Sequence, residues 1–305
     1  MESTEIKKAD IPNIGIGTAN MKNVEEVIYQ AIKDGVRLID TASMYKNEVE
    51  VGKAINKAIE DGIVKREDLF VVTKFWISEK EDPEKALKAS LERLNLKYVD
   101  LYLDHWPCGK CYNDPDKFKL VCVKDYWPKV EKLVEDGLTR YIGVSNHNVQ
   151  NLLIVLSIAK IKPYLNEVEF HPYLYQKDLL EFCKLENIKI LAYNPLVKGA
   201  YCKERHGKEM EERNLDFDLF NEQSVQELAR KYQKSPGQII LNWEIHRGVI
   251  PIPGTSNPER MKENLESNEF DMEESDYDNL DHFAEQGKEL RFCDSNKIYG
   301  IDIFA

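Results

Sequence analysis

The feature that most constrains the fold is an alternation of short apolar runs with longer amphipathic stretches, repeated eight times along the chain. The apolar runs predict strands at 14–18, 38–42, 70–74, 101–106, 141–145, 165–170, 189–194 and 248–253. Helical patterns follow them at 23–34, 47–60, 83–94, 125–136, 148–158, 176–187, 222–233 and 257–265. Each helix is long enough to connect two parallel strands. Eight such units in series predict a closed (α/β)8 barrel.

The main alternative fold is an open, doubly wound sheet. Such a sheet usually carries a GxGxxG turn directly after its first strand. The turn at 15–20 reads GIGTAN, which lacks the third glycine and the start of a helix. The pattern therefore favours the barrel.

Length and charge indicate one large domain without nucleic-acid partners. A chain of 305 residues is a usual length for a single α/β barrel, so we expect one domain over 1–305. The net charge of −12 argues against a nucleic-acid-binding surface. No run of about 18 apolar residues occurs, and the first residues lack the apolar core of a signal peptide. We expect a soluble, cytoplasmic monomer that does not bind membranes.

The six cysteines are most simply interpreted as reduced thiols. Cys108 and Cys111 form a CxxC, which leaves zinc binding or thioredoxin-like chemistry open. No second CxxC follows, and no βαβ unit starts around this one. The pattern favours two thiols in a loop.

Three segments interrupt the regular alternation. Segments 107–124 and 195–221 follow the fourth and seventh strands and are too long for simple connections. Long loops on this face of a barrel are where substrate and cofactor clamps belong. The C-terminal extension, 285–305, is expected to close over the barrel mouth. A short N-terminal β-hairpin is expected before the barrel.

Polar residues stand where the predicted strands end. Asp40, Lys74 and His105 close three successive apolar runs, and Tyr45 lies five residues beyond Asp40. Scattered through a core, such groups would be costly to bury. The carboxyl ends of barrel strands open on one face, where these groups can satisfy one another and perform chemistry. The arrangement is typical of an enzyme.

The same positions belong to a wider set of motifs. The blocks are 35–42 (GVRLIDTA) with Tyr45, Asn47, Glu48 and Gly52, then 101–107 (LYLDHWP), 143–146 (GVSN), 166–173 (NEVEFHPY), 191–196 (LAYNPL) and 252–255 (IPGT). From about residue 4 to residue 300 the chain resembles the aldo-keto reductase family, in particular its aldose reductase-like members. The resemblance implies an (α/β)8 barrel that reduces aldehydes or ketones with a nicotinamide dinucleotide bound without a Rossmann fold.

The resemblance also implies a role for each of four catalytic residues. Tyr45 would donate a proton to the carbonyl oxygen, although an ordinary phenol, with a pKa of about 10, is a slow acid near neutrality. Lys74 would lower that pKa, because a nearby cation stabilises a phenolate. Asp40 would keep Lys74 charged and oriented. His105, as a neutral donor, would position the carbonyl oxygen.

Cofactor contacts follow from further matching positions. The nicotinamide carboxamide needs short polar side chains, and Ser145 and Asn146 match the family positions that supply them. Glu167 stands where the family usually has glutamine; an ionised carboxylate can accept a hydrogen bond but cannot donate one. Tyr193 would stack on the nicotinamide ring. The full expected set is Gly17, Thr18, Asp40, Ser145, Asn146, Glu167, Tyr193, Asn194, Pro195, Leu196, Ile252, Gly254, Thr255, Ser256, Asn257, Arg260, Glu263 and Asn264.

The end of the eighth strand bears on the choice of dinucleotide. The family usually has a lysine for the 2′-phosphate where this chain has Gly254. Arg260 can still bind a phosphate through two hydrogen bonds or stack on adenine. Thr255 and the start of the helix at 257 add neutral donors. We expect NADP(H) as the cofactor, with NAD(H) as a second one.

The substrate pocket is expected to involve Ala19, Trp76, His105 and Trp106. Family members commonly carry a large aromatic residue at the position of Ala19, so the pocket should be wider there. The expected partner is a small-molecule carbonyl compound. Asp104, by strand alternation, should face the helices rather than the barrel interior, and needs a partner there.

Two other functions remain as alternatives. One is a non-catalytic nucleotide-binding sensor or structural protein of the same fold, which the intact set of four catalytic residues disfavours. The other is a metal-dependent hydrolase that uses Asp40, His105 and His171. Such barrels usually carry paired histidine ligands on an early strand, and the first two strands here have none. We therefore expect no bound metal and a packing role for His171.

Overall fold

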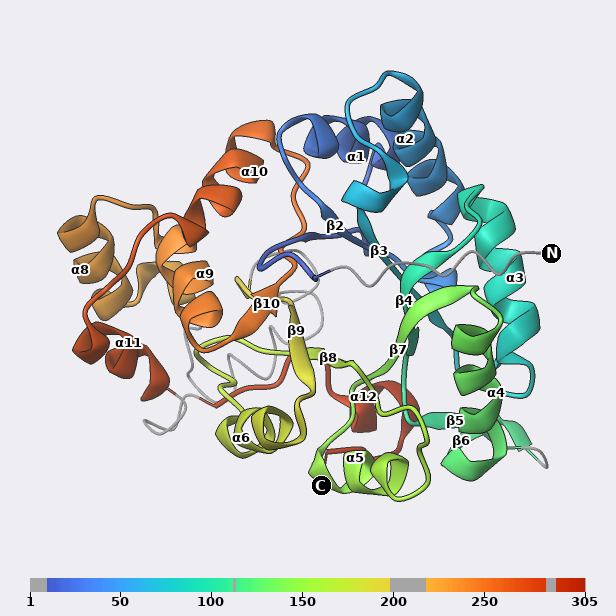
Figure 1. Ribbon diagram of the computed structural model, residues 1–305. Helices are drawn as coiled ribbons and strands as arrows, with labels where there is room; N and C mark the ends of the chain where they lie inside the picture. The colour runs from blue at the N-terminus through green and yellow to red at the C-terminus, as the bar shows by residue number, and fades with distance from the viewer. Residues whose placement is uncertain (1–9, 112–113, 198–217, 284–288, 305) are drawn as a thin grey trace.

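The protein is an eight-stranded parallel ring surrounded by helices (Figure 1). The computed structural model describes residues 10–111, 114–197, 218–283 and 289–304. In order around the ring, the strands are β1 (Ile16–Gly17), β2 (Leu38–Asp40), β3 (Phe70–Phe75), β4 (Val99–Asp104), β7 (Thr139–Ser145), β8 (Leu165–Glu169), β9 (Lys189–Tyr193) and β10 (Val249–Pro251). The amide of Gly15 donates to the carbonyl of Pro251 at 3.0 Å, which brings the first strand beside the last. The predicted barrel is confirmed.

All eight predicted helices are present in the described residues. They are α1 (Val24–Lys33), α2 (Glu48–Glu60), α3 (Pro83–Leu94), α4 (Val123–Glu135), α5 (Val149–Leu156), α6 (Lys177–Glu186), α8 (Gln223–Tyr232) and α10 (Pro258–Leu265). Short 3₁₀ turns lie at Ser43–Tyr45, Arg66–Asp68, Leu219–Asn221 and Glu266–Asn268. Three helices were not predicted: α9 (Pro236–His246), α11 (Glu274–Asp281) and α12 (Ser295–Tyr299). The first of them begins with a capping box, in which Ser235 and Gln238 satisfy each other's backbone amides.

The core has two layers, because alternate residues of each strand face opposite sides. Inward-facing side chains form one cluster: Ile11, Leu38, Phe70, Val72, Leu101, Leu103, Leu165, Leu191, Ile250 and Ile252. The outward-facing residues pack against the helices in a second, larger cluster. Two residues beyond Leu38, Val72 and Leu165, on the same inward rows, come Asp40, Lys74 and Glu167. The strand period therefore brings these three polar side chains together at one end of the barrel.

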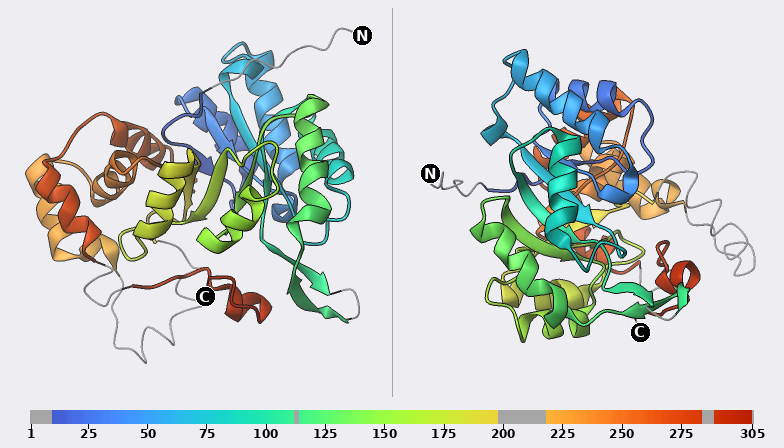
Figure 2. Two further views of the ribbon diagram at one scale, coloured as in Figure 1. Left: turned by 60° about the horizontal axis from the view of Figure 1, so that its bottom comes forward. Right: turned by 90° about the vertical axis from the view of Figure 1, so that its right-hand side faces the viewer.

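The end of the barrel that carries these groups is covered by two segments. One is the antiparallel hairpin β5 (Cys108–Cys111) and β6 (Asp114–Leu120), and the other is the C-terminal extension with α12. They lie side by side at the same end of the barrel (Figure 2). Cys108 packs with Ile77, Trp106 and Ile303, so the hairpin strand and the C-terminus share one small apolar cluster.

These segments bear out some loop predictions and leave others untested. In its described part the C-terminal extension crosses the barrel mouth as expected, beginning with a backbone hydrogen bond from Leu290 to Tyr173. The expected N-terminal hairpin would begin within residues 1–9, and most of the loop 195–221 falls in 198–217; both ranges lie outside the described residues. Among the described helices, none is long and apolar enough to cross a membrane.

Candidate active site

Lys74 is the centre of the site. Its ammonium donates to Asp40 Oδ1 at 2.6 Å, to the carbonyl of Thr41 at 3.0 Å and to the phenol oxygen of Tyr45 at 3.3 Å. Glu167 Oε1 lies 3.3 Å away, and the Lys74 side chain has no exposed surface. Burial lowers the pKa of Lys74, but the charges of Asp40 and Glu167 outweigh that and raise the pKa well above its usual value. The ammonium is therefore permanently charged.

Tyr45 is held at the mouth of the barrel, at the end of the 3₁₀ turn Ser43–Tyr45. We expected Lys74 to lower the pKa of the phenol, and its charge does act in that direction. The net shift is the opposite: burial raises the pKa of Tyr45 above its ordinary value, and the cation offsets only part of this. Lys74 therefore acts in the expected direction, but the withdrawal of the phenolate from water has the larger effect. The phenol keeps its proton, and the hydrogen bond from Lys74 to its oxygen leaves that proton free to be donated.

His105 stands directly beside the phenol. Its ring meets that of Tyr45 edge-on at 5.6 Å between centroids and that of Trp76 at 5.0 Å. Burial and the charges of Lys74 and Lys80 hold the pKa of His105 well below its usual value, so the imidazole is neutral. Nδ1 is buried and makes no hydrogen bond to any described residue. A neutral imidazole keeps one N–H donor, as the sequence predicted.

Asp104, the residue before His105, finds its partner on the helix side of β4. It accepts hydrogen bonds from Lys80 and from the hydroxyl of Tyr126 on α4, the latter at 2.5 Å. The predicted outward orientation is confirmed. The strand ends at Asp104 rather than at residue 106, so His105 and Trp106 lie just beyond a buried ion pair that anchors the strand end.

A second polar group lies beside the first, where β7, β8 and β9 end. Asn146 donates through Nδ2 to Ser145 Oγ and to the carbonyl of His105, both at 3.0 Å, and accepts from the Tyr193 hydroxyl at 2.8 Å. Ser145 Oγ donates to the backbone carbonyl of Glu167 at 2.9 Å. The structure thus brings together the residues predicted for the carboxamide.

Besides His105 Nδ1, Glu167 Oε2 and Thr18 Oγ1 are buried without a hydrogen-bond partner among the described residues. Buried polar atoms normally have a partner, so open acceptors and donors at a strand end indicate a place for a polar ligand. Burial and the neighbouring charge of Asp40 raise the pKa of Glu167 to about 8. Near neutral pH its carboxyl therefore carries a proton and can donate as well as accept. This arrangement fits an amide such as the nicotinamide carboxamide.

The predicted phosphate-binding residues gather at the end of β10 and the start of α10. Asn257 caps the helix by accepting from the amides of Glu259 at 2.8 Å and Arg260 at 3.4 Å, and Thr255 Oγ1 accepts from the amide of Asn257 at 3.1 Å. Of the remaining predicted residues here, Gly254, Ser256 and Glu263 are exposed, Asn264 is half-buried and Ile252 is buried.

Gly254 lies against the first strand. A Cβ at this position would come within 3.2 Å of the carbonyl oxygen of Gly17. The amide of Thr18 in turn donates to the carbonyl of Asp40 at 3.0 Å. A short path of backbone contacts therefore joins the phosphate end of the site to the Lys74 cluster. A side chain in place of Gly254 would need the Gly17 carbonyl to move away by a few tenths of an ångström.

Glu169 connects the site to the C-terminal extension. Its carboxylate accepts from Asn194 Nδ2 at 3.0 Å and from the amides of Phe292 and Cys293 at 3.2 and 2.8 Å. His171 Nε2 lies 3.2 Å from the same carboxylate and is fully buried. His171 therefore has the packing role that was predicted and does not join Asp40 and His105. Beyond Asn194, Pro195 is buried and Leu196 is half-buried against the core.

The aromatic wall expected around His105 is larger than predicted. Trp76 and Trp106 line it as expected, and Tyr299 of the C-terminal extension meets them with ring centroids at 6.3 and 5.2 Å. Phe304 packs against Trp106 at 6.2 Å. Sequence reasoning missed Tyr299 and Phe304; the available signal was the presence of three separated aromatic residues in a segment expected to cross the mouth. Ala19, at the other side, is exposed.

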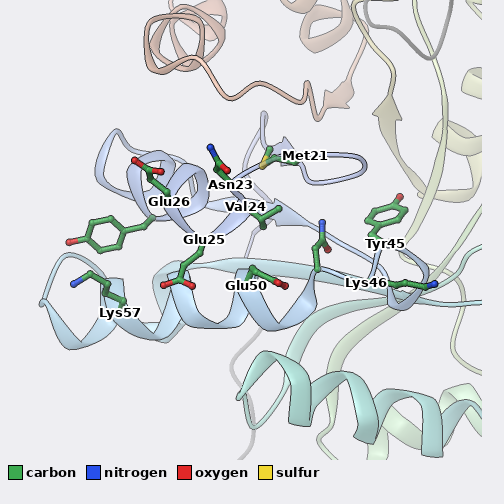
Figure 3. A pocket seen from close by; sticks show the side chains of 11 residues that line it. Met21, Asn23, Val24, Glu25, Glu26, Tyr45, Lys46, Glu50 and Lys57 are labelled. Carbon is green, nitrogen blue, oxygen red and sulfur yellow. The ribbon is translucent and has the colours of Figure 1, made fainter. Parts of the chain in front are cut away.

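A cavity of about 750 Å³ opens between α1 and α2 (Figure 3). Its lining runs from Tyr45 along Glu25 and Glu50 to Lys57. Of the four predicted catalytic residues, only Tyr45 borders it. The other three lie inside the barrel end, so this groove adjoins the site rather than containing it.

Comparison with known proteins agrees with this geometry. The model of the aldo/keto reductase family matches residues 12–285. The chain is 38% identical to an NAD(P)H-dependent D-xylose reductase of Pyricularia oryzae, covering 96% of this chain and 94% of that protein. It is 37% identical to an NADH-dependent D-xylose reductase of Candida parapsilosis, covering 97% and 95%.

A solved aldose reductase from Giardia lamblia superposes with a TM-score of 0.85, at 28% identity and over 96% of this chain and 98% of that one. The match spans the barrel and both groups of polar residues described above. By fold, by motif and by overall sequence, the chain belongs to the aldo-keto reductase family.

Proposed function

We propose that this protein reduces aldehydes and ketones to alcohols with Tyr45 as the proton donor. The reaction class, NAD(P)H-dependent carbonyl reduction, follows from membership of the family. The observation that carries the catalytic assignment is the ammonium of Lys74, which is buried, charged and 3.3 Å from the phenol oxygen.

Each residue has one task in this proposal. The carbonyl oxygen would lie between the Tyr45 hydroxyl and the neutral His105 ring. The two rings meet edge-on, with their centroids 5.6 Å apart. Tyr45 donates its proton as charge develops on that oxygen, and Lys74 stabilises the phenolate that remains. Asp40 holds Lys74 in place at 2.6 Å. The bound nicotinamide dinucleotide supplies the hydride.

The dinucleotide would be held at both of its ends by residues that the structure brings together. Ser145, Asn146 and Glu167 offer hydrogen bonds to the carboxamide, and Tyr193 offers its ring. The phosphate end would lie on 252–257 and the first turn of α10. This assignment is supported by the unpartnered buried oxygen of Glu167 and by the exposed backbone and side chains around Asn257.

For the choice between dinucleotides, we infer a preference for NADPH that depends on Arg260. Its side chain is exposed on the first turn of α10 and is available to a 2′-phosphate. Arg260→Ala should raise the Kd for NADPH by about tenfold, because a charge-assisted hydrogen bond contributes about 1.5–3 kcal/mol. The Kd for NADH should change little. Fluorescence titrations with both dinucleotides measure the two Kd values. An equal increase in both would show that Arg260 contacts only the adenine.

The names of the two xylose reductases favour aldoses as the first substrates to test. Purified protein should oxidise NADPH, followed at 340 nm, in the presence of D-xylose or a short aldehyde. A panel of aldehydes, ketones, quinones and keto esters would then define the substrate class. Binding of NADPH without turnover on any member of the panel would instead support a nucleotide-binding sensor of the same fold.

A further inference from the structure

The surroundings of Lys74 contain more acceptors than the ammonium has protons. Four oxygens lie around Nζ: Asp40 Oδ1 at 2.6 Å, the Thr41 carbonyl at 3.0 Å, and Tyr45 Oη and Glu167 Oε1, both at 3.3 Å. An ammonium group has three protons to donate. Asp40 and Thr41 take two of them at short distances. The third is donated to Tyr45, and Glu167 Oε1, at the same distance from Nζ, is placed to compete for it.

Among the described residues, Glu167 has few ionisable neighbours. It is 2% exposed, and its other oxygen, Oε2, has no hydrogen-bond partner among the described residues. In register on the two flanking strands are Ser145 of β7 and Leu191 of β9, neither of which carries a charge. The titratable groups that face the carboxyl come from β2, β3 and the turn after β2; they are Asp40, Lys74 and Tyr45.

We propose that Glu167 is a positioning residue that competes with Tyr45 for the third proton of Lys74, so that its ionisation governs how well the ammonium supports the phenol. Ionised Glu167 draws Lys74 toward itself and adds a negative charge beside the phenolate that reduction leaves behind. When Glu167 is neutral, the third proton of the Lys74 ammonium is available to the Tyr45 oxygen. The inference rests on the proposed catalytic roles of Tyr45 and Lys74.

The direction of the effect follows from the burial of the carboxyl. Burial and Asp40 raise the pKa of Glu167 to about 8, so the neutral, permissive form predominates near neutral pH. Above that pH the carboxylate forms and carbonyl reduction should slow. Glutamine has nearly the same shape as glutamate and does not titrate. Glu167 would therefore give this protein an alkaline limit that the variant Glu167→Gln lacks.

The first test compares single-turnover rates of carbonyl reduction by the parent and Glu167→Gln across pH. A single ionisation with a pKa of about 8 makes the parent lose about tenfold in rate between roughly pH 7 and pH 9. The variant should lose much less, so the ratio of variant to parent rate should rise about tenfold over that interval. A constant ratio would overturn the proposal.

The second test needs neither cofactor nor turnover. A carboxyl whose pKa is higher in the folded than in the unfolded protein destabilises the fold as pH rises from the unfolded value, about 4.3, through the folded one. The urea concentration at the unfolding midpoint of Glu167→Gln should therefore rise relative to that of the parent as pH rises from about 5 to 8.5. A difference independent of pH would contradict the ionisation assigned to Glu167.

Glu169→Gln is the matched control, because Glu169 lies two positions along the same strand and is equally buried but faces His171 and Asn194. Hydrogen bonds and His171 lower the pKa of Glu169 despite its burial, so the stability that Glu169 adds is present at neutral pH and lost on acidification. The Glu169→Gln substitution should lower the stability of the protein at neutral pH. The pH at which the single-turnover rate falls to half should stay at its parental value.

The outcomes separate this inference from the function on which it rests. Loss of turnover in Tyr45→Phe combined with a parental rate profile in Glu167→Gln would overturn the role of Glu167 and leave the proposed chemistry intact. Retained turnover in Tyr45→Phe would overturn the catalytic assignment itself. A shifted profile and a pH-dependent gain in stability in Glu167→Gln would support the inference.

Discussion

At the scale of single residues, the site depends on one buried cation. Lys74 has no exposed surface, and its charge is balanced by Asp40 at 2.6 Å and approached by Glu167 at 3.3 Å. Burying an ammonium costs several kcal/mol unless it is paired, and two carboxyls with a backbone carbonyl provide the pairing. The same contacts that allow Lys74 to be buried also direct it at Tyr45.

Lys74→Met should therefore cost both activity and stability. Removal of one partner from a buried ion pair costs about 3–5 kcal/mol, because a charge is left without compensation. The double variant Lys74→Met/Asp40→Asn should recover part of that stability and none of the turnover. Urea unfolding and NADPH oxidation measure the two effects. Full stability in the single variant would show that Asp40 and Glu167 do not depend on the ammonium.

The identities of the site residues could be predicted from the sequence, but their electrostatics could not. Asp40, Lys74 and His105 follow apolar runs, and strand periodicity was enough to bring them to one end of a barrel. The lowering effect of Lys74 on the pKa of Tyr45 was predicted, but the larger upward effect of burial depends on how completely the phenol leaves water, which the sequence does not report. The 3.3 Å approach of Glu167 to Lys74 depends on the curvature of the ring, which periodicity does not report.

At the scale of elements, the C-terminal extension is anchored to the barrel by Glu169 of β8 and by Gln176, which precedes α6. Glu169 accepts from two successive amides of the C-terminal extension, those of Phe292 and Cys293, and Arg291 donates to Gln176 at 2.9 Å. These contacts position the segment that delivers Tyr299 and Phe304 to the aromatic wall. The C-terminal extension therefore contributes to the aromatic wall around His105.

Glu169→Gln should loosen this segment. The amide side chain has one acceptor oxygen and no charge, so it can keep only part of the carboxylate's hydrogen bonds. Hydrogen exchange at the amides of Phe292 and Cys293 should become at least several-fold faster, while amides in α3 exchange at the parental rate. Unchanged exchange at both positions would show that other contacts hold the extension.

Two of the elements that were not predicted, α9 and the β5–β6 hairpin, lack the usual sequence pattern for different reasons. In α9, eight of eleven residues are buried, including Gln238, Asn242 and Glu244, so no polar face marks the helix in the sequence. The pattern of an amphipathic helix is then missing, although Ser235, Pro236 and Gln238 carry the signals of a helix start. The β5–β6 hairpin has the opposite difficulty, because its strands are dominated by charged and polar residues.

At the scale of the whole molecule, stability should depend on carboxyls that the barrel buries in neutral form. Glu244 on α9 has no exposed surface, and neither of its carboxyl oxygens has a partner among the described residues. Burial raises the pKa of Glu244 well above its usual value. The folded protein therefore binds a proton that the unfolded chain releases, and stability falls as pH rises above the unfolded pKa.

Glu244→Gln should remove this dependence. As pH rises from about 5 to 8, the free energy of unfolding of the variant should increase relative to that of the parent. The increase should be about 1.4 kcal/mol for each pH unit over which Glu244 of the parent is protonated in the folded state and ionised in the unfolded state. Glu227→Gln, at an exposed position of α8, is the control and should follow the parent at every pH. Parallel curves for Glu244→Gln and the parent would mean that Glu244 is ionised in the fold.

The central claim is that Tyr45 donates the proton in carbonyl reduction, and Tyr45→Phe tests it most directly. The variant keeps the ring and its contact with His105 but has no proton to donate. Turnover of D-xylose or a short aldehyde should fall by about 10²–10⁴-fold, with the Kd for NADPH near the parental value. Retention of more than about a tenth of the parental turnover, with NADPH still bound, would contradict the account.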